Sequence, residues 1–375
     1  MAYDSDSDGS VDADLMALLM ASRAPPPPPP PDTKVLKSAH HIFDNSIDVA
    51  LNRDATYAAA EKIYTAMKTR NYSTQTWASH DLHPGVGKVG FETEEDVVAA
   101  VFLIDLLNFS FWSLRGEEER FGVQYVGKKQ TGYWSLCAAV RRALDEGIPI
   151  TSPYLWVDEQ AFTLEMARYV FRSETEEEMP LLEARVECMR EAGRVLCEEY
   201  DGHFVNMIKE AGQSAVNLVL LVVEKFSCFR DEQRFEGKRV TFYKRAQILV
   251  ADLWACFNAT SYGTFPDITA LTMFADYRIP QILQSLGCLW YSPGLETAIM
   301  RKQLIPSGSA WEIQIRGCSI WCVELIRRRI IEMHPEVGEG MNAVLLDFYL
   351  YDAAKEMEAR GGGGLPHHRT RSIWY

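Results

Sequence analysis

The chain has 375 residues, of which 47% are hydrophobic and 24% charged, a composition typical of a globular protein with a sizeable core. Asp and Glu (52) outnumber Lys and Arg (38), so the formal net charge is −14. This charge argues against a protein that binds nucleic acid along a basic surface. A local basic pocket for a small phosphorylated ligand remains compatible with it.

The first 31 residues differ in composition from the rest. Five Asp precede seven consecutive prolines, Pro25 to Pro31, and polyproline cannot join a packed core. We predict a disordered acidic and proline-rich leader over 1–31, with docking to a Pro-binding domain as the alternative. Residues 32–375 are predicted to form a helical domain. This domain could consist of two helical subdomains packed together.

The acidic N-terminus does not resemble a secretory signal, and no run of about eighteen apolar residues predicts a membrane span. Eight cysteines scatter through apolar stretches, as free thiols do in a reducing compartment. We therefore expect a cytoplasmic protein. Cys318 and Cys322 lie one helical turn apart, but zinc would need two further ligands, so we interpret them as core residues.

Hydrophobic periodicity predicts an all-α fold, mostly helical with minor short hairpins. Asp54 is expected to cap a helix with the apolar stripe Ala60, Ile63, Tyr64 and Met67. Thr93 and Asp96 resemble a capping box before Val97. Further helices are predicted over 134–146, 180–200, 214–226, 242–257, 310–333 and 342–358.

Strand signals are few. Residues 122–126 alternate and could pair around a turn at Gly127, and residues 235–241, which include Gly237, could form a hairpin arm. The last residues, after the glycine run 361–364, end in Ile-Trp-Tyr. Because these side chains are largely apolar, we expect the end of the chain to pack on the protein rather than to be exposed to solvent.

The stretch 265–280 is the most unusual. Asp267 is expected to cap a helix in which Asp276 falls among apolar residues. Pro280 lacks the N–H that would bond the carbonyl of Asp276, so a kink is predicted there. A carboxylate in such surroundings is a candidate catalytic group, and a structural ion pair with Arg278 is the alternative.

The stretch 345–352 predicts one helical arc that carries two acids and two aromatics: Asp347, Phe348, Tyr351 and Asp352. Such an arc suits a cationic planar ligand, and a solvated amphipathic helix is the alternative. Aromatic runs at 107–113 and 132–136 could form a pocket wall, although core packing would also explain them.

Basic islands at 238–239, 244–245 and 368–371 could each hold a phosphate, although a surface position would also explain each of them. Motifs for nucleotide-binding loops, zinc proteases and serine hydrolases are absent from the sequence. We expect no metal and no cofactor.

Several of these stretches together resemble one known family, the queuosine salvage proteins, which are queuosine 5′-phosphate N-glycosylases (hydrolases). The resemblance runs from about residue 35 to the end and leaves out the leader. Its segments are LNFSFWS (107–113), SLCAAVRRALDEGIPIT (135–151), FEGKRVTFYKRAQILVADLW (235–254), ITALTMFADYRIPQIL (268–283), RGCSIWCVELIR (316–327), LLDFYLYD (345–352) and HRTRSIWY (368–375).

The resemblance implies an all-α fold related to the helix-hairpin-helix DNA glycosylases. It also implies that water cleaves the N-glycosidic bond of queuosine 5′-phosphate, which releases queuine and ribose 5-phosphate. Asp276 would be the nucleophile or would stabilise the oxocarbenium-like state. The substrate-binding positions implied are His80, Met273, Phe274, Asp347, Phe348 and Asp352, with Phe348 where relatives are expected to carry Tyr.

The phosphate of such a substrate needs cations. The candidate phosphate-binding residues are the basic Lys244, Arg245, His368, Arg369 and Arg371, together with Tyr243. We expect a small-molecule nucleotide as the partner, and neither nucleic acid nor a membrane, while the oligomeric state stays unassigned. The alternatives are a nucleic-acid base-excision glycosylase on the same fold and a non-catalytic helical adaptor.

Overall fold

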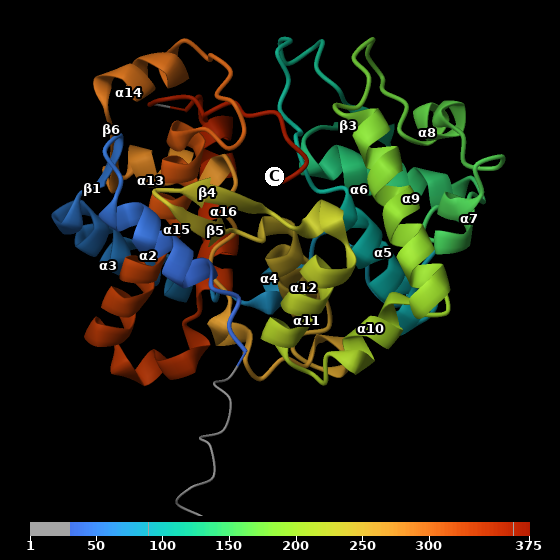
Figure 1. The fold of residues 1–375 in the computed structure, drawn as a ribbon, viewed down its shortest axis with the longest axis horizontal. Coiled ribbons are helices and arrows are strands. Elements are labelled where there is room, and N and C mark those ends of the chain that lie inside the picture. The colour runs from blue at the N-terminus through green and yellow to red at the C-terminus, as the bar shows by residue number, and fades with distance from the viewer. Residues whose placement is uncertain (1–30, 89, 363) are drawn as a thin grey trace, which may run out of the picture. The chain divides into compact units, whose positions relative to one another are not determined.

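Helices make up most of the fold, as the periodicity predicts, in the computed structural model of the chain (Figure 1). The structure describes residues 31–88, 90–362 and 364–375, and Thr33–Tyr375 group into one unit. Nearly all of the predicted leader lies outside the described residues, so its boundary stays a prediction. The relationship to helix-hairpin-helix glycosylases also stays a prediction.

The helices are α2 (Val35–Asp44), α3 (Arg53–Thr69), α4 (Thr74–Ala78), α5 (Glu94–Leu106), α6 (Tyr133–Asp145), α7 (Pro153–Val157), α8 (Leu164–Val170), α9 (Leu182–Glu199), α10 (Phe204–Glu210), α11 (Ala215–Lys225), α12 (Lys244–Cys256), α13 (Arg278–Ser285), α14 (Pro293–Met300), α15 (Ala310–Met333) and α16 (Ala343–Ala359). Short 3-10 turns are η1 (Ser227–Phe229), η2 (Ser261–Gly263), η3 (Ile268–Ala270) and η4 (Pro335–Gly340). None of these described helices has both the length and the hydropathy of a membrane span.

The strands of the described chain form two-stranded antiparallel sheets. Both predicted hairpins are confirmed: β2 (Val123–Tyr125) pairs with β3 (Lys128–Gln130), and β4 (Glu232–Phe235) pairs with β5 (Lys238–Thr241). Gly127 and Gly237 have positive φ in their turns, as two-residue hairpin turns require. The third sheet pairs β1 (Val49–Leu51) with β6 (Leu289–Tyr291), which lies far away in sequence.

Local capping signals decide where two helices begin. The capping box of α5 is confirmed, because Thr93 Oγ1 accepts from the Asp96 N–H at 3.1 Å and Asp96 accepts from the Thr93 N–H at 2.9 Å. The predicted cap of α3 is wrong. Asn52 caps it by accepting from the Ala55 N–H, while Asp54 lies in the first turn, where its charge favours the helix start. The predicted apolar stripe of α3 is buried.

The prediction of a helix through Asp276 is also wrong. After η3 the chain runs without helix from residue 271 to 276, and α13 begins at Arg278. Pro280 therefore lies in the first turn of a helix, where a missing N–H costs no hydrogen bond. It marks the start of α13 rather than a kink within a longer helix.

Asp267 caps a helix other than the one expected. Its carboxylate accepts from the backbone N–H groups of Ala215 (2.7 Å) and Val216 (3.2 Å) at the start of α11, and from the Ser214 hydroxyl. These are N–H groups that α11 itself cannot satisfy. The cap thus ties two segments that are more than fifty residues apart.

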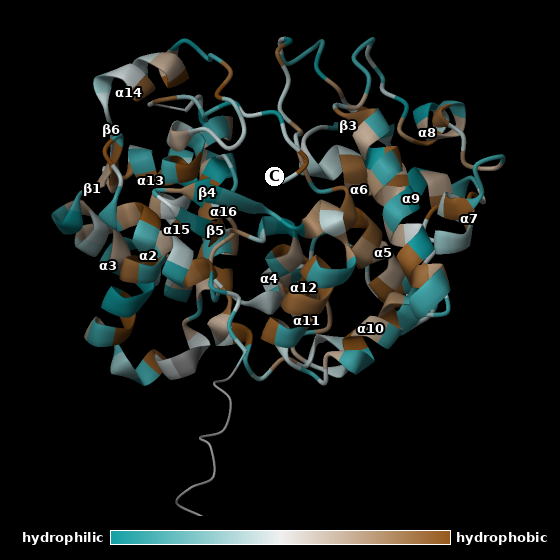
Figure 2. Ribbon diagram, viewed as in Figure 1, coloured by the Kyte–Doolittle hydropathy of each residue, from teal (hydrophilic) through white to brown (hydrophobic). Residues whose placement is uncertain are grey.

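Two buried helices organise the packing. α12 packs against α4, α5 and α11, and α15 packs against α2, α3 and α16. Figure 2 shows hydrophobic residues over much of α5, α11 and α12, consistent with their burial. In Figure 1, α5 to α11 lie together on one side, and α2, α3 and α13 to α16 lie together on the other.

The C-terminal segment docks on the protein, as its apolar end predicts. The Ser110 N–H donates to the Tyr375 carbonyl at 3.0 Å, and the Trp112 indole N–H donates to the Thr370 carbonyl at 2.9 Å. The buried Tyr375 ring lies 4.3 Å from the guanidinium of Arg316, which forms a fully buried ion pair with Asp231. The segment is therefore part of the core.

The contact between α15 and α2 depends on a glycine. A Cβ atom placed on Gly317 would lie 2.5 Å from Ile42 Cγ2 and 2.6 Å from Ile42 Cβ. We expect Gly317→Ala to lower the free energy of unfolding by about 1–3 kcal/mol, because the two helices must move apart. Urea unfolding at neutral pH measures this change.

Gly294→Ala in α14 is the matched control, because its Cβ would lie 3.7 Å from the nearest atom, Trp311 Cζ2. Alanine favours the helix there, so we expect no loss, or a gain of up to about 1 kcal/mol. Equal effects of the two substitutions would show that the α2–α15 contact tolerates a methyl group.

Candidate functional site

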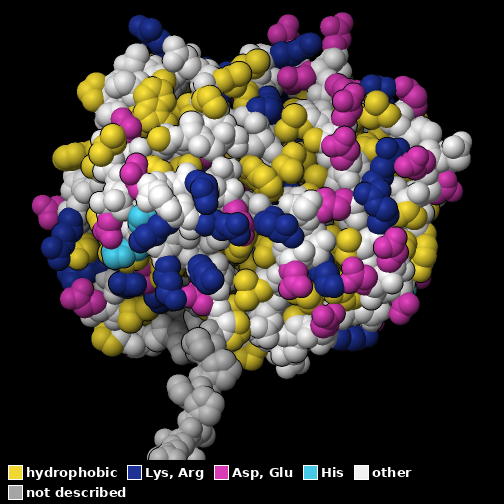
Figure 3. Space-filling model, viewed as in Figure 1, with side chains coloured by type: hydrophobic (Ala, Val, Ile, Leu, Met, Phe, Trp, Pro, Cys, Tyr) yellow, Lys and Arg dark blue, Asp and Glu magenta, His cyan; other side chains and the backbone are white. Residues whose placement is uncertain are grey.

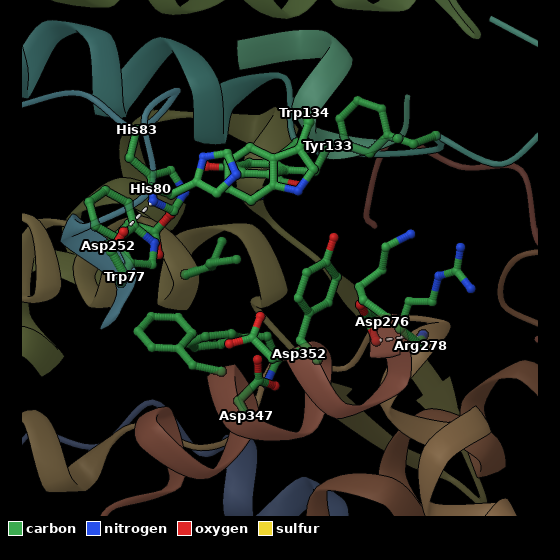
Figure 4. Close-up of a pocket in the computed structure, with 18 of the residues that line it drawn as sticks. Trp77, His80, His83, Tyr133, Trp134, Asp252, Asp276, Arg278, Asp347 and Asp352 are labelled. Carbon is green, nitrogen blue, oxygen red and sulfur yellow. Dashed lines mark hydrogen bonds between the residues drawn. The ribbon is translucent and has the colours of Figure 1, made fainter. Parts of the chain in front are cut away.

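A cavity of about 440 Å³ brings together most of the stretches singled out in the sequence (Figure 4). Its lining residues come from both aromatic runs, from the stretch around Asp276, from the acidic arc of α16 and from one face of α12. Residues 72–83 and Tyr375 complete it. The segments converge although they lie hundreds of residues apart.

Asp276 lies at the start of α13, where two backbone groups hold its carboxylate. Oδ1 accepts from the N–H of Arg278 at 2.8 Å and from that of Ile279 at 2.9 Å. Burial raises the pKa of Asp276, while the nearby charge of Lys244 and these two N–H groups oppose the rise. The helix start thus fixes the carboxylate and favours its negative charge.

Asp347 on α16 faces the same region. Its Oδ1 accepts from the backbone N–H of Phe274 at 2.9 Å, which ties the non-helical approach to Asp276 onto α16. Burial, and next the negative charge of Asp276, raise the pKa of Asp347 well above its ordinary value. Two carboxylates in one site are therefore driven toward different protonation states.

The rest of the predicted arc also lines the cavity: Phe348, Tyr351 and Asp352. The ring of Phe348 lies 6.2 Å from that of Phe274. Asp352 Oδ2 accepts from the Tyr72 hydroxyl at 2.5 Å. Burial raises the pKa of Asp352, and the Tyr72 hydrogen bond opposes the rise.

Aromatic side chains form the opposite wall. His80 stacks on Trp134 with centroids 3.4 Å apart and an interplanar angle of 11°, and Trp77 stacks on His83 at 3.7 Å and 13°. Burial lowers the pKa of both imidazoles, that of His83 to about 3, so the stacks are uncharged at neutral pH. Figure 4 shows the His80–Trp134 pair across the cavity from Asp347 and Asp352.

Of the predicted phosphate-binding residues, Lys244 lines the cavity. The others, together with Met273, lie outside its lining: Tyr243, Arg245, His368, Arg369 and Arg371. Met273 is fully buried, Tyr243 donates to Glu232 at 2.6 Å, and Arg245 donates to the carbonyls of Leu106 and Cys228.

The last three of that set belong to the docked C-terminal segment itself. His368 contacts the Tyr375 hydroxyl at 3.2 Å, and Arg371 donates to the Ser110 carbonyl at 3.0 Å. Arg369 lies 5.6 Å from the Trp112 ring. Lys238 and Arg239, the remaining predicted basic island, are exposed residues of β5. Figure 3 shows basic side chains gathered over this part of the surface.

Two cations that the sequence reasoning missed also line the cavity, Arg278 and Lys355. Both contact Glu358, at 3.1 Å and 2.6 Å. Arg278 follows Asp276 by two residues. This spacing suggests an ion pair between the two, but it does not predict that Arg278 lines a cavity. Lys355 follows Asp352 by three residues on the same helix, which places it beside the acidic arc.

Asp252 and Tyr72 are further lining residues without a sequence prediction. Asp252 shares one face of α12 with Lys244 and Ile248 at a spacing of four residues, which was the available signal. Its Oδ1 has no hydrogen-bond partner among the described residues. Tyr72 follows the end of α3 and carried no pattern that would have singled it out.

Buried charges surround Lys244 at the base of the cavity. Burial lowers the pKa of Lys244, whereas the carboxylates of Asp276, Asp105 and Asp347 oppose this effect. Asp105 accepts from the Asn108 amide at 3.1 Å, and its Oδ2 has no partner among the described residues. Burial raises the pKa of Asp105 to about 7.

The cysteines lie in the core. Cys318 and Cys322 are completely buried, which confirms them as core residues, and all eight thiols are free. No cluster of three or more His, Cys, Asp or Glu side chains suited to a metal ion occurs in the part of the chain that the structure describes.

Known proteins resemble this chain over nearly its whole length. The family model described as "Queuosine salvage protein" matches residues 89–375. A Mus musculus protein named "Queuosine 5'-phosphate N-glycosylase/hydrolase" is 45% identical over 90% of this chain and 98% of its own length. Proteins with the same name are 41% identical in Schizosaccharomyces pombe, over 92% of this chain and 100% of their own length, and 37% identical in Sphaerobacter thermophilus, over 91% and 97%.

The buried Asp105 makes the stability of the protein depend on pH. Because its pKa is raised to about 7 in the folded state, the folded protein retains a proton that the unfolded chain releases above about pH 4. The contribution of this group to stability is therefore present below about pH 4 and is lost as the pH rises to about 7. Asp105→Asn removes this dependence.

We expect the free energy of unfolding of Asp105→Asn, relative to wild type, to be higher at about pH 8 than at about pH 5. Urea unfolding at both pH values measures it. Asp54→Asn, an exposed position in α3, serves as the control and should show a smaller change. A difference independent of pH would contradict a proton held by Asp105.

Proposed function

This chain belongs to the queuosine salvage protein family, and we propose that it hydrolyses the N-glycosidic bond of queuosine 5′-phosphate. It is thus an N-glycosyl hydrolase that releases queuine and ribose 5-phosphate and supplies queuine for tRNA modification. The observation that carries the proposal is Asp276, a carboxylate fixed by two backbone N–H groups inside a cavity with cations near it and an acidic, aromatic wall.

Asp276 suits the reaction because cleavage of a ribosyl C–N bond builds positive charge at the anomeric carbon. A carboxylate already held in place stabilises that charge without reorganisation, and little water screens it in a buried site. Asp276 then acts as nucleophile or as electrostatic stabiliser. Water supplies the hydroxyl group to the anomeric carbon, and the base leaves with the bonding electrons and a proton.

The acidic and aromatic wall suits the base. The His80–Trp134 stack, with Phe274 and Phe348, offers faces for a planar heterocycle. Queuine carries a secondary amine that is protonated at neutral pH. Asp347 and Asp352 lie on this wall, and a cation beside them favours their carboxylate forms over the neutral forms that burial favours. Loss of the hydroxyl at Phe348, where relatives are expected to carry Tyr, keeps the stacking surface.

Lys244, Arg278 and Lys355 are the cations proposed for the 5′-phosphate, because all three line the cavity. Arg278 is two residues from Asp276, so a phosphate beside it would lie within one ribose of the reacting carbon. A substrate with an anionic phosphate at one end and a cationic amine at the other accounts for basic and acidic side chains in one cavity.

The direct test is incubation of the purified chain with queuosine 5′-phosphate, followed by mass spectrometry for free queuine. We expect release by the wild type, and turnover at least 10²-fold slower in Asp276→Asn, which stays folded and still binds substrate. Near-normal turnover by the variant would remove Asp276 from the mechanism. No release by the wild type would contradict the proposed function.

Phosphate recognition is tested at the rim of the cavity. We expect Lys355→Ala to lower kcat/KM for the nucleotide by about 10-fold, because a cation that contacts phosphate is lost, and to change it little for the nucleoside queuosine. Lys68→Ala, which removes an exposed cation of α3 outside the cavity lining, is the control. Equal losses on nucleotide and nucleoside would show that Lys355 does not contact the phosphate.

A further inference from the structure

Tyr72 and Asp352 meet at the cavity from opposite ends of the sequence. The Tyr72 hydroxyl donates to Asp352 Oδ2 at 2.5 Å, and both residues line the cavity. A bond this short between a phenol and a carboxylate is a charge-assisted hydrogen bond. It leaves the second carboxylate oxygen of Asp352 to a ligand.

The backbone fixes the Tyr72 hydroxyl from outside α16. Asn71 takes the left-handed conformation (φ 49°) after α3, and the Tyr72 N–H donates back to the Met67 carbonyl at 3.0 Å. The Tyr72 ring then packs edge-on against Tyr349, with centroids 5.6 Å apart. The turn after α3 therefore places a donor against a carboxylate of α16.

The groups around Asp352 have opposing effects on its protonation. Burial and the negative charge of Glu356 favour its neutral form, whereas the Tyr72 hydrogen bond and the Arg70 guanidinium favour the carboxylate. The Arg70 guanidinium itself donates two hydrogen bonds, of 2.7 Å and 3.0 Å, to the carboxylate of Glu356. Tyr351 and Lys355, on the same helix, and Asp347 are further titratable groups close by. The Tyr72 hydroxyl is thus the one direct donor to Asp352 in the described structure.

We propose that Tyr72 is a positioning residue for base selectivity: its hydroxyl holds Asp352 as an oriented carboxylate that pairs with a cationic amine on the substrate base. The inference rests on the proposed function, because it assigns that amine to a queuine-type base. Without the hydroxyl, the carboxylate would rotate and would take up a proton at a higher pH. Discrimination for a cationic base over a neutral 7-deazaguanine would then fall.

Tyr72→Phe tests this, because phenylalanine keeps the ring against Tyr349 and removes only the hydroxyl. Calorimetry would measure binding of queuine and of 7-deazaguanine, which lacks the amine, at about pH 6 and about pH 8. We expect queuine to bind about 10-fold more weakly to the variant and 7-deazaguanine to change by less than about 2-fold. The loss for queuine is larger at the lower pH, because more of Asp352 is then protonated.

Tyr349→Phe is the matched control, since it removes a hydroxyl from the neighbouring ring outside the cavity lining. In an Asp352→Asn background, Tyr72→Phe should have little further effect on queuine binding. Equal losses for both ligands, or a loss that persists in that background, would reduce Tyr72 to a packing residue and overturn the inference. Wild-type protein that binds no queuine would overturn the proposed function, and this inference with it.

Discussion

The site depends on the two N–H groups at the start of α13 that hold Asp276. For them to reach the carboxylate, the helix must begin at Arg278, and the preceding residues must be non-helical. Pro280 is compatible with that start, and the Phe274 N–H is then free to bond Asp347 on α16. One helix boundary therefore sets the relative positions of two acids and joins α13 to α16.

The charged groups around Lys244 determine which ligand charges the cavity favours. Lys244 and the neighbouring Arg245 are buried cations, and the acidic groups of Asp276, Asp105 and Asp347 act on Lys244. The grouped acids raise the proton affinity of some of them and favour a positively charged group beside them, while the cations that line the same cavity suit an anionic group. The carboxylate of Asp276, which two backbone N–H groups hold in place, is the group available where the reaction develops positive charge.

Local signals predicted most of the fold, whereas long-range hydrogen bonds decided the rest. The α5 capping box, both hairpins and the bounds of α15 follow from neighbouring residues. The cap that Asp267 provides for α11 depends on a segment far away in sequence, so periodicity could not show it. In the site, the arc of α16 was predicted from its spacing, whereas Tyr72 could not be, because it lies outside the helices and its partner Asp352 is far away in sequence.

The packing of α2 and α3 on α15 has a consequence for biosynthesis. The apolar faces of the first two helices find their partner only when a helix that begins at residue 310 has been translated. Contacts of such sequence separation make folding slow, and until then the early helices expose surface that other unfolded chains can bind. A nascent chain of this protein is therefore expected to need chaperone protection for most of its elongation.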